Sequence, residues 1–199
     1  MPITIHEVLK NIDQEKAKDL IPLVNLFEIE ETLNKNILNK IIGNSSETIE
    51  VPQLIVEAFN KDIKEVGEDK WLTCIWEAFF DFASGVGKVI GSPLLSKWIS
   101  WEKSLRYQIA EVRSSKTYEQ NYEWDHKSLL GEWRAINDPL AGEKILDEER
   151  IKFIDEESKR YSFTIDEIVA YLLKVNLLSR YVKLKKEEGI KILKEVTKL

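Results

Sequence analysis

The chain contains few of the residues that usually carry covalent cross-links or catalytic chemistry. Only one of its 199 residues is cysteine and two are histidine, so no internal disulfide can form. Cys74 lies among aromatic residues with no histidine close in sequence, which favours a buried, unreactive thiol. Gly85, Gly87 and Gly91 are not followed by the lysine and serine or threonine of a phosphate-binding loop. A nucleotide site is therefore not expected.

Metal ligands are equally scarce. Glu123 and His126 form one Glu-x-x-His pair, whereas a di-iron bundle needs two such pairs and two further inward-facing glutamates. The pair also spans a predicted junction between a loop and a helix. We therefore expect His126 to lie beside a helix cap, and we expect no metal and no other cofactor.

Excess positive charge and long apolar runs are also missing. The formal net charge is −6, which argues against binding to a nucleic-acid backbone. No apolar run approaches the roughly 20 residues that span a bilayer, and no signal peptide is visible after Met1. The sequence therefore predicts a cytoplasmic protein with no nucleic-acid partner and no direct membrane insertion.

Helix start and stop signals are plentiful, whereas strand alternation is almost absent. Thr4–Glu7 and Thr164–Glu167 are capping boxes. Ser92 and Asp138 are each followed by proline, which is typical of a helix N-terminus. These signals predict an all-α fold, an irregular bundle of about nine helices.

The whole chain, residues 1–199, is predicted to form one helical domain. If a subdomain boundary exists, the turn-rich stretch 43–51 is the best candidate. The expected helices are a short one to Ile12, 13–42 with a kink or an early start at Pro22, 52–66, 69–84 broken by Gly85, Gly87 and Gly91, 92–116, 125–133, 138–161, 164–182 and 185–198.

Two of these helices carry matching ionic stripes. On the long helix that starts at Ser92, a stripe of charged residues runs beside an apolar stripe that includes Trp98 and Trp101. On the Pro139 helix, a second charged stripe runs beside Leu146, and Gly142 would allow a close helix approach. The charged residues are Glu102, Arg106 and Arg113 on the first helix and Glu143, Asp147 and Arg150 on the second.

If the two helices pack antiparallel, Glu102 would approach Arg150. Arg106 and Arg113 would then form ion pairs with the carboxylates of Glu143 and Asp147. A catalytic acid–base pair is the alternative for the two acids. Neighbouring arginines would lower carboxylate pKa values, which works against an acid at neutral pH. We therefore expect a structural ion-pair network and no enzymatic activity.

The aromatic residues of the helix that begins near Asp69 have two interpretations. They cover more than one face of a short helix, so the helix is either fully buried or partly a surface for a partner. The residues in question are Trp71, Phe79, Phe80 and Phe82.

Several motifs resemble an uncharacterised bacterial family. The motifs are Trp98-x-x-Trp101-Glu102-x-x-Leu105-Arg106 with Ala110 and Arg113, Asn137-x-Pro139-Leu140-x-x-Glu143-x-x-Leu146-Asp147-x-x-Arg150, Phe163-x-x-Asp166 followed by Tyr171-Leu172-Leu173-Lys174-x-x-x-Leu178-x-Arg180-Tyr181, and Glu188-Gly189. Genes of that family are typically found in operons for V/A-type ATPases. Its members are distantly similar to the helical central-stalk component of these ATPases, a socket on the membrane rotor ring that receives the rotating shaft.

The resemblance implies an all-helical, non-catalytic accessory or central-stalk-like component of a V/A-type ATPase, a machine of ion or proton transport. Its partners would be shaft or rotor-ring subunits, and it could lie at the membrane periphery through that complex. The motif residues would form the ionic brace and a core of Trp98, Trp101, Leu146, Tyr171 and Leu178. Two alternatives stay open: an interaction or assembly module that uses the aromatic helix 71–82, and a helical enzyme with Glu143 and Asp147 as its acid pair.

Overall fold

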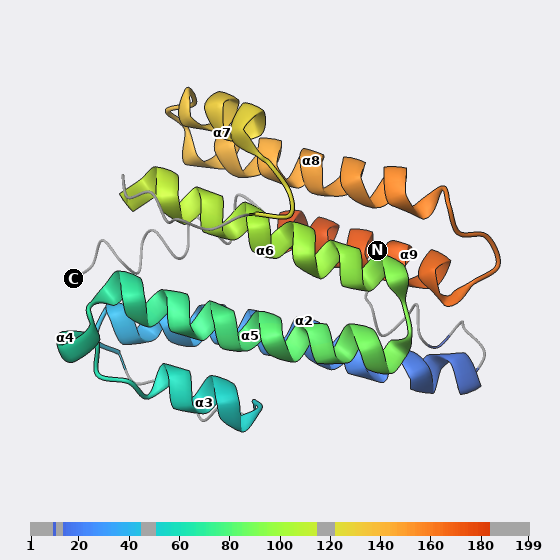
Figure 1. Cartoon of the computed structure of the whole chain (residues 1–199), viewed down its shortest axis with the longest axis horizontal. Coiled ribbons are helices and arrows are strands. Elements are labelled where there is room, and N and C mark those ends of the chain that lie inside the picture. Colours follow the sequence, from blue (N-terminus) through green and yellow to red (C-terminus); the bar gives the residue numbers. More distant parts are fainter. Residues whose placement is uncertain (1–9, 11–13, 45–50, 115–121, 184–199) are drawn as a thin grey trace.

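The computed structural model describes residues 10, 14–44, 51–114 and 122–183, and this part of the chain is entirely helical and irregular coil. The prediction of an all-α fold is confirmed. Eight helices are described (Figure 1): α2 (Gln14–Ile41), α3 (Gln53–Phe59), α4 (Ile63–Val66), α5 (Glu68–Ile90), α6 (Pro93–Ser114), α7 (Lys127–Arg134), α8 (Pro139–Ser158) and α9 (Ile165–Lys183). The predicted capping box at Thr4 and the predicted helix 185–198 lie outside the described residues, as does most of the candidate boundary 43–51.

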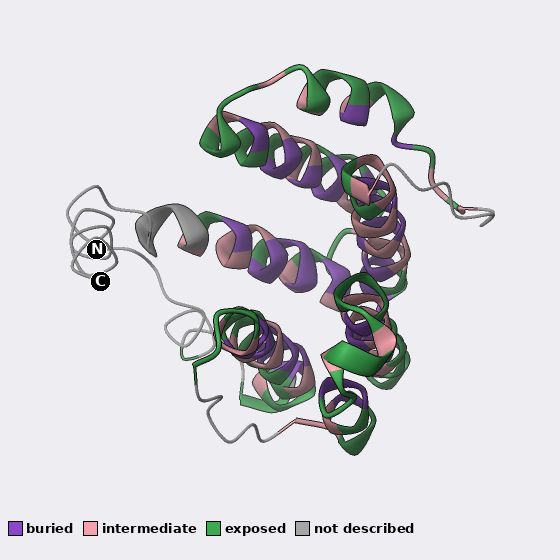
Figure 2. Cartoon of the chain, turned by 90° about the vertical axis from the view of Figure 1, so that its left-hand side faces the viewer, coloured by how far each residue is buried: buried purple, intermediate pink, exposed green. Residues whose placement is uncertain are grey.

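The long helices form two layers. Viewed end-on, α6, α5 and α3 follow one another on one side, and α8, α9 and α2 follow one another on the other (Figure 2). Within and between these layers the pairs α5–α6, α2–α5, α6–α9 and α8–α9 are in contact. The purple buried residues face the space between the layers, as expected when each helix buries one apolar stripe (Figure 2).

Two predicted helix starts have the expected local chemistry. The Asp138 carboxylate accepts a hydrogen bond from Leu140 N at 3.1 Å, and Pro139 follows at the first helical position. The Ser92 hydroxyl accepts from Leu95 N at 3.0 Å and so caps α6. The capping box before α9 differs by one residue from the prediction, because the Glu167 carboxylate accepts from Phe163 N at 3.1 Å rather than from Thr164 N.

A second acid completes the cap of α6 from across the bundle. Asp166, in the first turn of α9, is buried and accepts hydrogen bonds from the Ser92 hydroxyl at 2.6 Å and from Leu94 N at 3.0 Å. One carboxylate therefore satisfies two donors at the start of a helix 72 residues earlier in the chain. This contact fixes the start of α9 against the turn between α5 and α6.

The predicted break of the aromatic helix at Gly85 and Gly87 is wrong. α5 continues through both glycines to Ile90. The predicted break at Gly91 is confirmed, because Gly91 caps the helix with φ 69°. At Gly87 an added Cβ would lie 3.1 Å from the Ser96 hydroxyl, so the missing side chain lets α5 and α6 approach closely. Close packing offsets the cost of glycine in a helix interior. The predicted continuation of one helix over 13–42 is confirmed, because α2 runs from Gln14 to Ile41 with Pro22 inside it.

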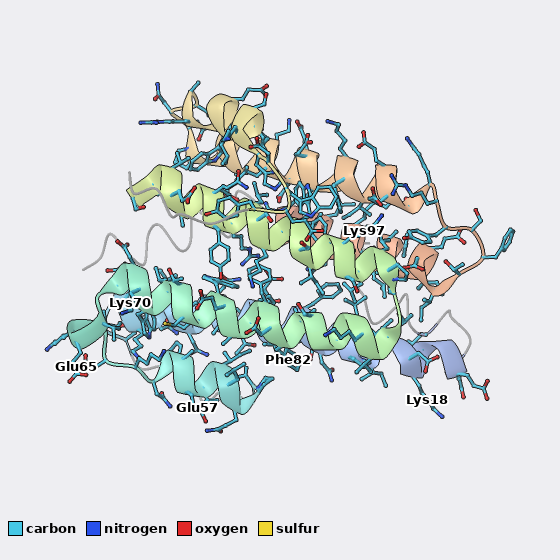
Figure 3. The ribbon with its side chains drawn as sticks, viewed as in Figure 1. Lys18, Glu57, Glu65, Lys70, Phe82 and Lys97 are labelled. Atoms are coloured by element: carbon cyan, nitrogen blue, oxygen red, sulfur yellow. The ribbon has the colours of Figure 1, made fainter. Side chains whose placement is uncertain are left out.

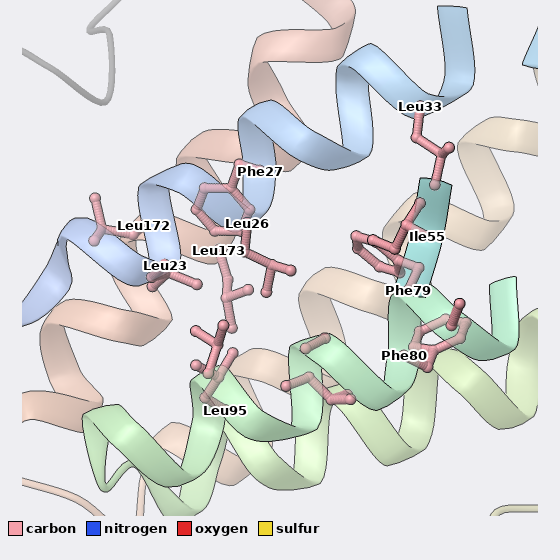
Figure 4. Close-up of a cluster of buried hydrophobic side chains, with 14 of the residues drawn as sticks. Leu23, Leu26, Phe27, Leu33, Ile55, Phe79, Phe80, Leu95, Leu172 and Leu173 are labelled. Atoms are coloured by element: carbon pink, nitrogen blue, oxygen red, sulfur yellow. The ribbon is translucent and has the colours of Figure 1, made fainter. Parts of the chain in front are cut away.

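One apolar core holds α2, α3, α5, α6 and α9 together. Leu23, Leu26 and Phe27 of α2 lie close to Leu172 and Leu173 of α9 (Figure 4). A second, smaller cluster joins α6, α7 and α8. Its buried members are Trp101, Leu105, Ile109, Leu130, Leu146 and Phe153.

The turn between α8 and α9 places a bulky residue in a conformation that favours glycine. Phe163 has φ 59° and its side chain is 99% exposed, so packing does not compensate for the backbone strain. We expect Phe163→Gly to raise the free energy of unfolding by about 0.5–1 kcal/mol. Gly91→Ala, at φ 69°, should lower it by about 1 kcal/mol, and urea unfolding measures both. A destabilised Phe163→Gly variant would contradict this explanation.

Candidate functional site

The centre of the molecule contains a buried pair of charged residues that joins α6 to α8. The Arg150 guanidinium donates from Nε to Glu102 Oε2 at 2.9 Å and from Nη2 to Glu102 Oε1 at 2.9 Å. Both side chains are buried, and the fork geometry makes the contact bidentate. The approach of Glu102 to Arg150 predicted for antiparallel helices is what the structure contains.

Three further residues extend this pair to α2. Arg150 also donates to Asp147 at 2.8 Å within α8. Arg106 donates to Glu102 at 2.8 Å within α6 and to Glu30 of α2. We call Glu30, Glu102, Arg106, Asp147 and Arg150 the ionic brace. It connects three helices that are far apart in the sequence.

Aromatic rings complete the surroundings of Arg106. Its guanidinium carbon lies 4.3 Å from the centroid of the Trp76 ring and 5.8 Å from that of Phe80. A guanidinium can stack on an aromatic face while its edge binds carboxylates. Arg106 therefore also ties α5 to the ionic brace.

Burial and pairing act in opposite directions on the brace. Burial alone would raise the pKa of Glu102, but the guanidinium groups of Arg150 and Arg106 outweigh it and lower that pKa to about 2. Burial would lower the pKa of Arg150, and the contacts with Glu102 and Asp147 outweigh it and raise it. The charged forms of Glu102 and Arg150 are thus favoured. A carboxylate held in this way is poorly suited to donate a proton near neutral pH.

Two predicted members of the network lie elsewhere. Arg113 is exposed, and its guanidinium carbon lies 5.4 Å from the centroid of the Trp133 ring instead of beside Asp147. Glu143 is also exposed, one turn before the buried Asp147. The reason is geometric. Arg150 lies on the same helix as Asp147 and binds it. The Arg106 guanidinium binds Glu30, which lies on a helix outside the predicted network.

Arg113 and Glu143 instead share an open groove with a volume of about 570 Å³. The groove lies between the C-terminal halves of α2 and α6 and the N-terminal halves of α5 and α8, where α5 and α6 diverge (Figure 1). Its lining includes the apolar residues Ile37, Leu72, Ile109 and Leu146 and, at the edges, Asp69, Arg113 and Glu143. We refer to it as the α5–α6 groove.

The aromatic residues of α5 do not form a partner surface. Trp71, Phe79 and Phe80 are buried in the main core, and Phe82 is half-buried and packs against it. Figure 3 shows Phe82 on α5, on the side away from α6. α5 is surrounded by α2, α3, α4 and α6, and each neighbour covers a different part of its circumference. Of the two interpretations of this helix, burial is the one the structure supports.

The five predicted core residues divide into two groups. Trp101 and Leu146 are buried, and Trp98 is half-buried with its ring stacked on Trp101 at a centroid distance of 5.5 Å. Tyr171 and Leu178 are 43% and 52% exposed, so their assignment to the core is wrong. They lie seven residues apart on one side of α9, whereas its buried residues face α2, α6 and α8.

The Glu-x-x-His pair is used for structure. The Ser100 hydroxyl donates to the Glu123 carboxylate, and His126 is buried against Trp101 with ring centroids 4.9 Å apart. Its main chain precedes α7, as predicted for a residue beside a cap. No group of three or more metal-binding side chains is found among the described residues. Cys74, expected to be buried, is half-buried.

Comparison with known proteins gives one match. Residues 128–199 match the model of a family described as "Protein of unknown function (DUF2764)". Of the described residues, this stretch includes most of α7 and all of α8 and α9, and therefore Asp147 and Arg150 of the ionic brace. No curated protein and no solved structure matches the chain. None of the helices in the described part has the length and apolar content needed to cross a membrane.

Proposed function

We propose that this protein is a non-catalytic accessory or central-stalk-like component of a V/A-type ATPase that acts by docking between rotor parts. The observation that carries the proposal is the ionic brace. Glu102 and Arg106 come from one of the motifs that resemble the ATPase-linked family, and Asp147 and Arg150 come from the next. These four residues contact one another in the centre of the molecule.

A docking component must transmit force without changing shape, and the brace suits that requirement. It connects α6 to α8 through the buried, bidentate Glu102–Arg150 contact and α6 to α2 through the half-buried Arg106–Glu30 contact. Lys97 adds a contact from α6 to Glu157 of α8 at 2.7 Å. Buried networks whose members are all paired give rigidity. Two core clusters support it on either side.

The α5–α6 groove is our candidate for the docking surface. Protein interfaces combine an apolar centre with a charged rim, and this groove has Leu72, Ile109 and Leu146 in its lining with Arg113 and Glu143 exposed at its edge. The interaction-module alternative loses its proposed anchor, because Trp71 and its neighbours are core. The enzyme alternative has no supporting contact, because Arg150 binds Asp147.

Affinity isolation of the tagged full-length chain from cells with its ATPase tests the proposal. Shaft or rotor-ring subunits are expected in the eluate. The double reversal Arg113→Glu, Glu143→Lys should lower their recovery at least tenfold, about 1.4 kcal/mol of binding free energy, because rim charges then face like charges of the partner.

Lys144→Glu is the matched control. Lys144 is exposed on α8, pairs with Glu148 at 3.7 Å and is not part of the groove lining, so recovery should stay unchanged. All variants should melt within a few degrees of the unaltered chain, because these side chains are exposed. Absence of every ATPase subunit from the unaltered chain's eluate would refute the ATPase role, whereas recovery unaffected by the double reversal would refute only the groove.

A further inference from the structure

One buried histidine and one glutamine form a central part of the attachment of the segment between α6 and α8 to the bundle. Gln108 of α6 donates from Nε2 to Trp124 O at 2.7 Å and accepts at Oε1 from His126 N at 3.0 Å. The side-chain amide thus pairs with the main chain of the segment at two points. We call residues 122–138, which include α7, the crossover.

The setting of the His126 imidazole favours its neutral form, because burial outweighs the groups that favour a proton. The ring packs edge-to-face on Trp101, with centroids 4.9 Å apart and an interplanar angle of 87°. A hydrogen bond to the main chain of Trp101 uses one ring nitrogen, and the buried Nε2 has no hydrogen-bond partner among the described residues. A proton on Nε2 would create a buried donor that lacks an acceptor.

The charged groups around His126 do not supply that acceptor. Glu102 of α6 is the carboxylate that acts on the imidazole most strongly, and Arg106 and Arg150 already bind it. Glu149 of α8 binds Lys152 at 3.3 Å, and Asp125 of the crossover accepts from Lys127 N at 3.0 Å.

We propose that the crossover is a proton-sensitive latch, which His126 holds closed while neutral and which opens when its imidazole takes up a proton. Opening would uncover the apolar faces of Trp101 and Phe153, which lie beneath Trp124 and Leu130 of the crossover. The device is local, because the ionic brace and the main core do not depend on these contacts.

The direction of the pH effect follows from the burial of His126. Burial lowers its pKa below the ordinary 6.5. The hydrogen bond to the Trp101 main chain and the carboxylates of Glu102, Asp125 and Glu149 oppose this only in part. Below pH 6.5 the open form therefore binds a proton that the closed form does not, so the closed form loses stability as the pH falls from 6.5 toward the lowered pKa. Above pH 6.5 the two forms bind equally few protons and the latch stays closed.

Hydrogen exchange of the full-length chain at pH 7.5 and pH 5.5, corrected for intrinsic exchange rates, tests the proposal. Protection of the His126 and Leu130 amides should fall by up to about tenfold at the lower pH, since one unit below the open-form pKa corresponds to tenfold. Amides in the middle of α5 should keep their protection. In His126→Phe, which keeps an aromatic ring but cannot titrate, the fall should be absent.

Protection that is unchanged in the original chain, or that falls equally in His126→Phe, would overturn the proposal. If His126→Phe does not fold, NMR titration of His6→Gln decides, because His126 is then the one imidazole left in the chain. A midpoint below 6.5 supports the latch, and a midpoint at or above 6.5 overturns it.

Discussion

Replacement of Arg150 by methionine is expected to lower the free energy of unfolding by about 3–5 kcal/mol, one of the two largest effects we predict. The variant keeps most of the volume but leaves the carboxylates of Glu102 and Asp147 buried without their shared cation. Removal of one partner of a buried pair costs this much because an uncompensated charge stays in the interior. Urea unfolding followed by tryptophan fluorescence measures the change.

Two further variants separate pairing from packing. Arg113→Met removes an exposed arginine whose guanidinium lies over the Trp133 ring, so it should cost about 1 kcal/mol or less. Adding Glu102→Gln and Asp147→Asn to Arg150→Met removes the uncompensated charges and should recover part of the loss. If Arg150→Met unfolds at the same urea concentration as Arg113→Met, the brace does not stabilise the fold.

The brace also predicts how stability depends on pH. The pKa of Glu102 is lowered from 4.5 to about 2 in the folded chain, so its contribution is complete above pH 4.5 and is lost as the pH falls from 4.5 to about 2. In Arg150→Met the cation that lowers this pKa most is gone. The difference in free energy of unfolding between the unaltered protein and Arg150→Met should therefore become smaller as the pH falls from 4.5 to about 2.

Antiparallel pairing of α6 and α8 could be predicted because both partners carry local signals. Stripes of acids and arginines at helical spacing identify matching faces. The expectation that Gly142 lets α8 approach α6 closely is wrong, because the close neighbour of Gly142 belongs to α7. At Gly142 an added Cβ would lie 3.1 Å from the Trp133 indole nitrogen. Glu30 could not be predicted, because it lies 76 residues before its partner on a helix with no such stripe. The role of Glu30 depends on where α2 packs in the tertiary structure, which local sequence signals do not determine.

The errors in the predicted core have the same origin. Tyr171 and Leu178 belong to an apolar helix whose sequence does not say which side stays uncovered. Glycine at 85 and 87 is normally a helix breaker, yet at Gly87 the need for close contact with Ser96 decides otherwise. Helix type and caps are local properties, whereas the buried side of a helix and its tolerance for glycine depend on its neighbours.

Replacement of Trp71 by alanine is also expected to cost about 3–5 kcal/mol of the free energy of unfolding. Trp71 is 0% exposed and is the meeting point of α2, α3 and α5. Its indole N–H donates to Phe59 O at 3.0 Å, and its ring lies 5.5 Å from that of Phe59. Lys40 of α2 places its ammonium 4.9 Å from the Trp71 ring and 4.6 Å from the Phe59 ring. Loss of the indole therefore leaves a cavity and removes one of the two donors to Phe59 O, which also accepts from the Lys40 ammonium at 2.5 Å. It also removes one of the two rings beside that ammonium.

This prediction decides between the two interpretations of the aromatic helix. A core residue costs stability when it is removed, whereas a partner-binding residue costs affinity and leaves the melting temperature of the free chain unchanged. Thermal melting of Trp71→Ala beside Phe163→Ala, where the aromatic side chain is 99% exposed, provides the comparison. We expect a fall in melting temperature of about 10 °C or more for Trp71→Ala, and little change for Phe163→Ala. Equal melting temperatures for both variants would return Trp71 to the candidates for a partner surface, because the indole would then contribute nothing to the packing of α2, α3 and α5.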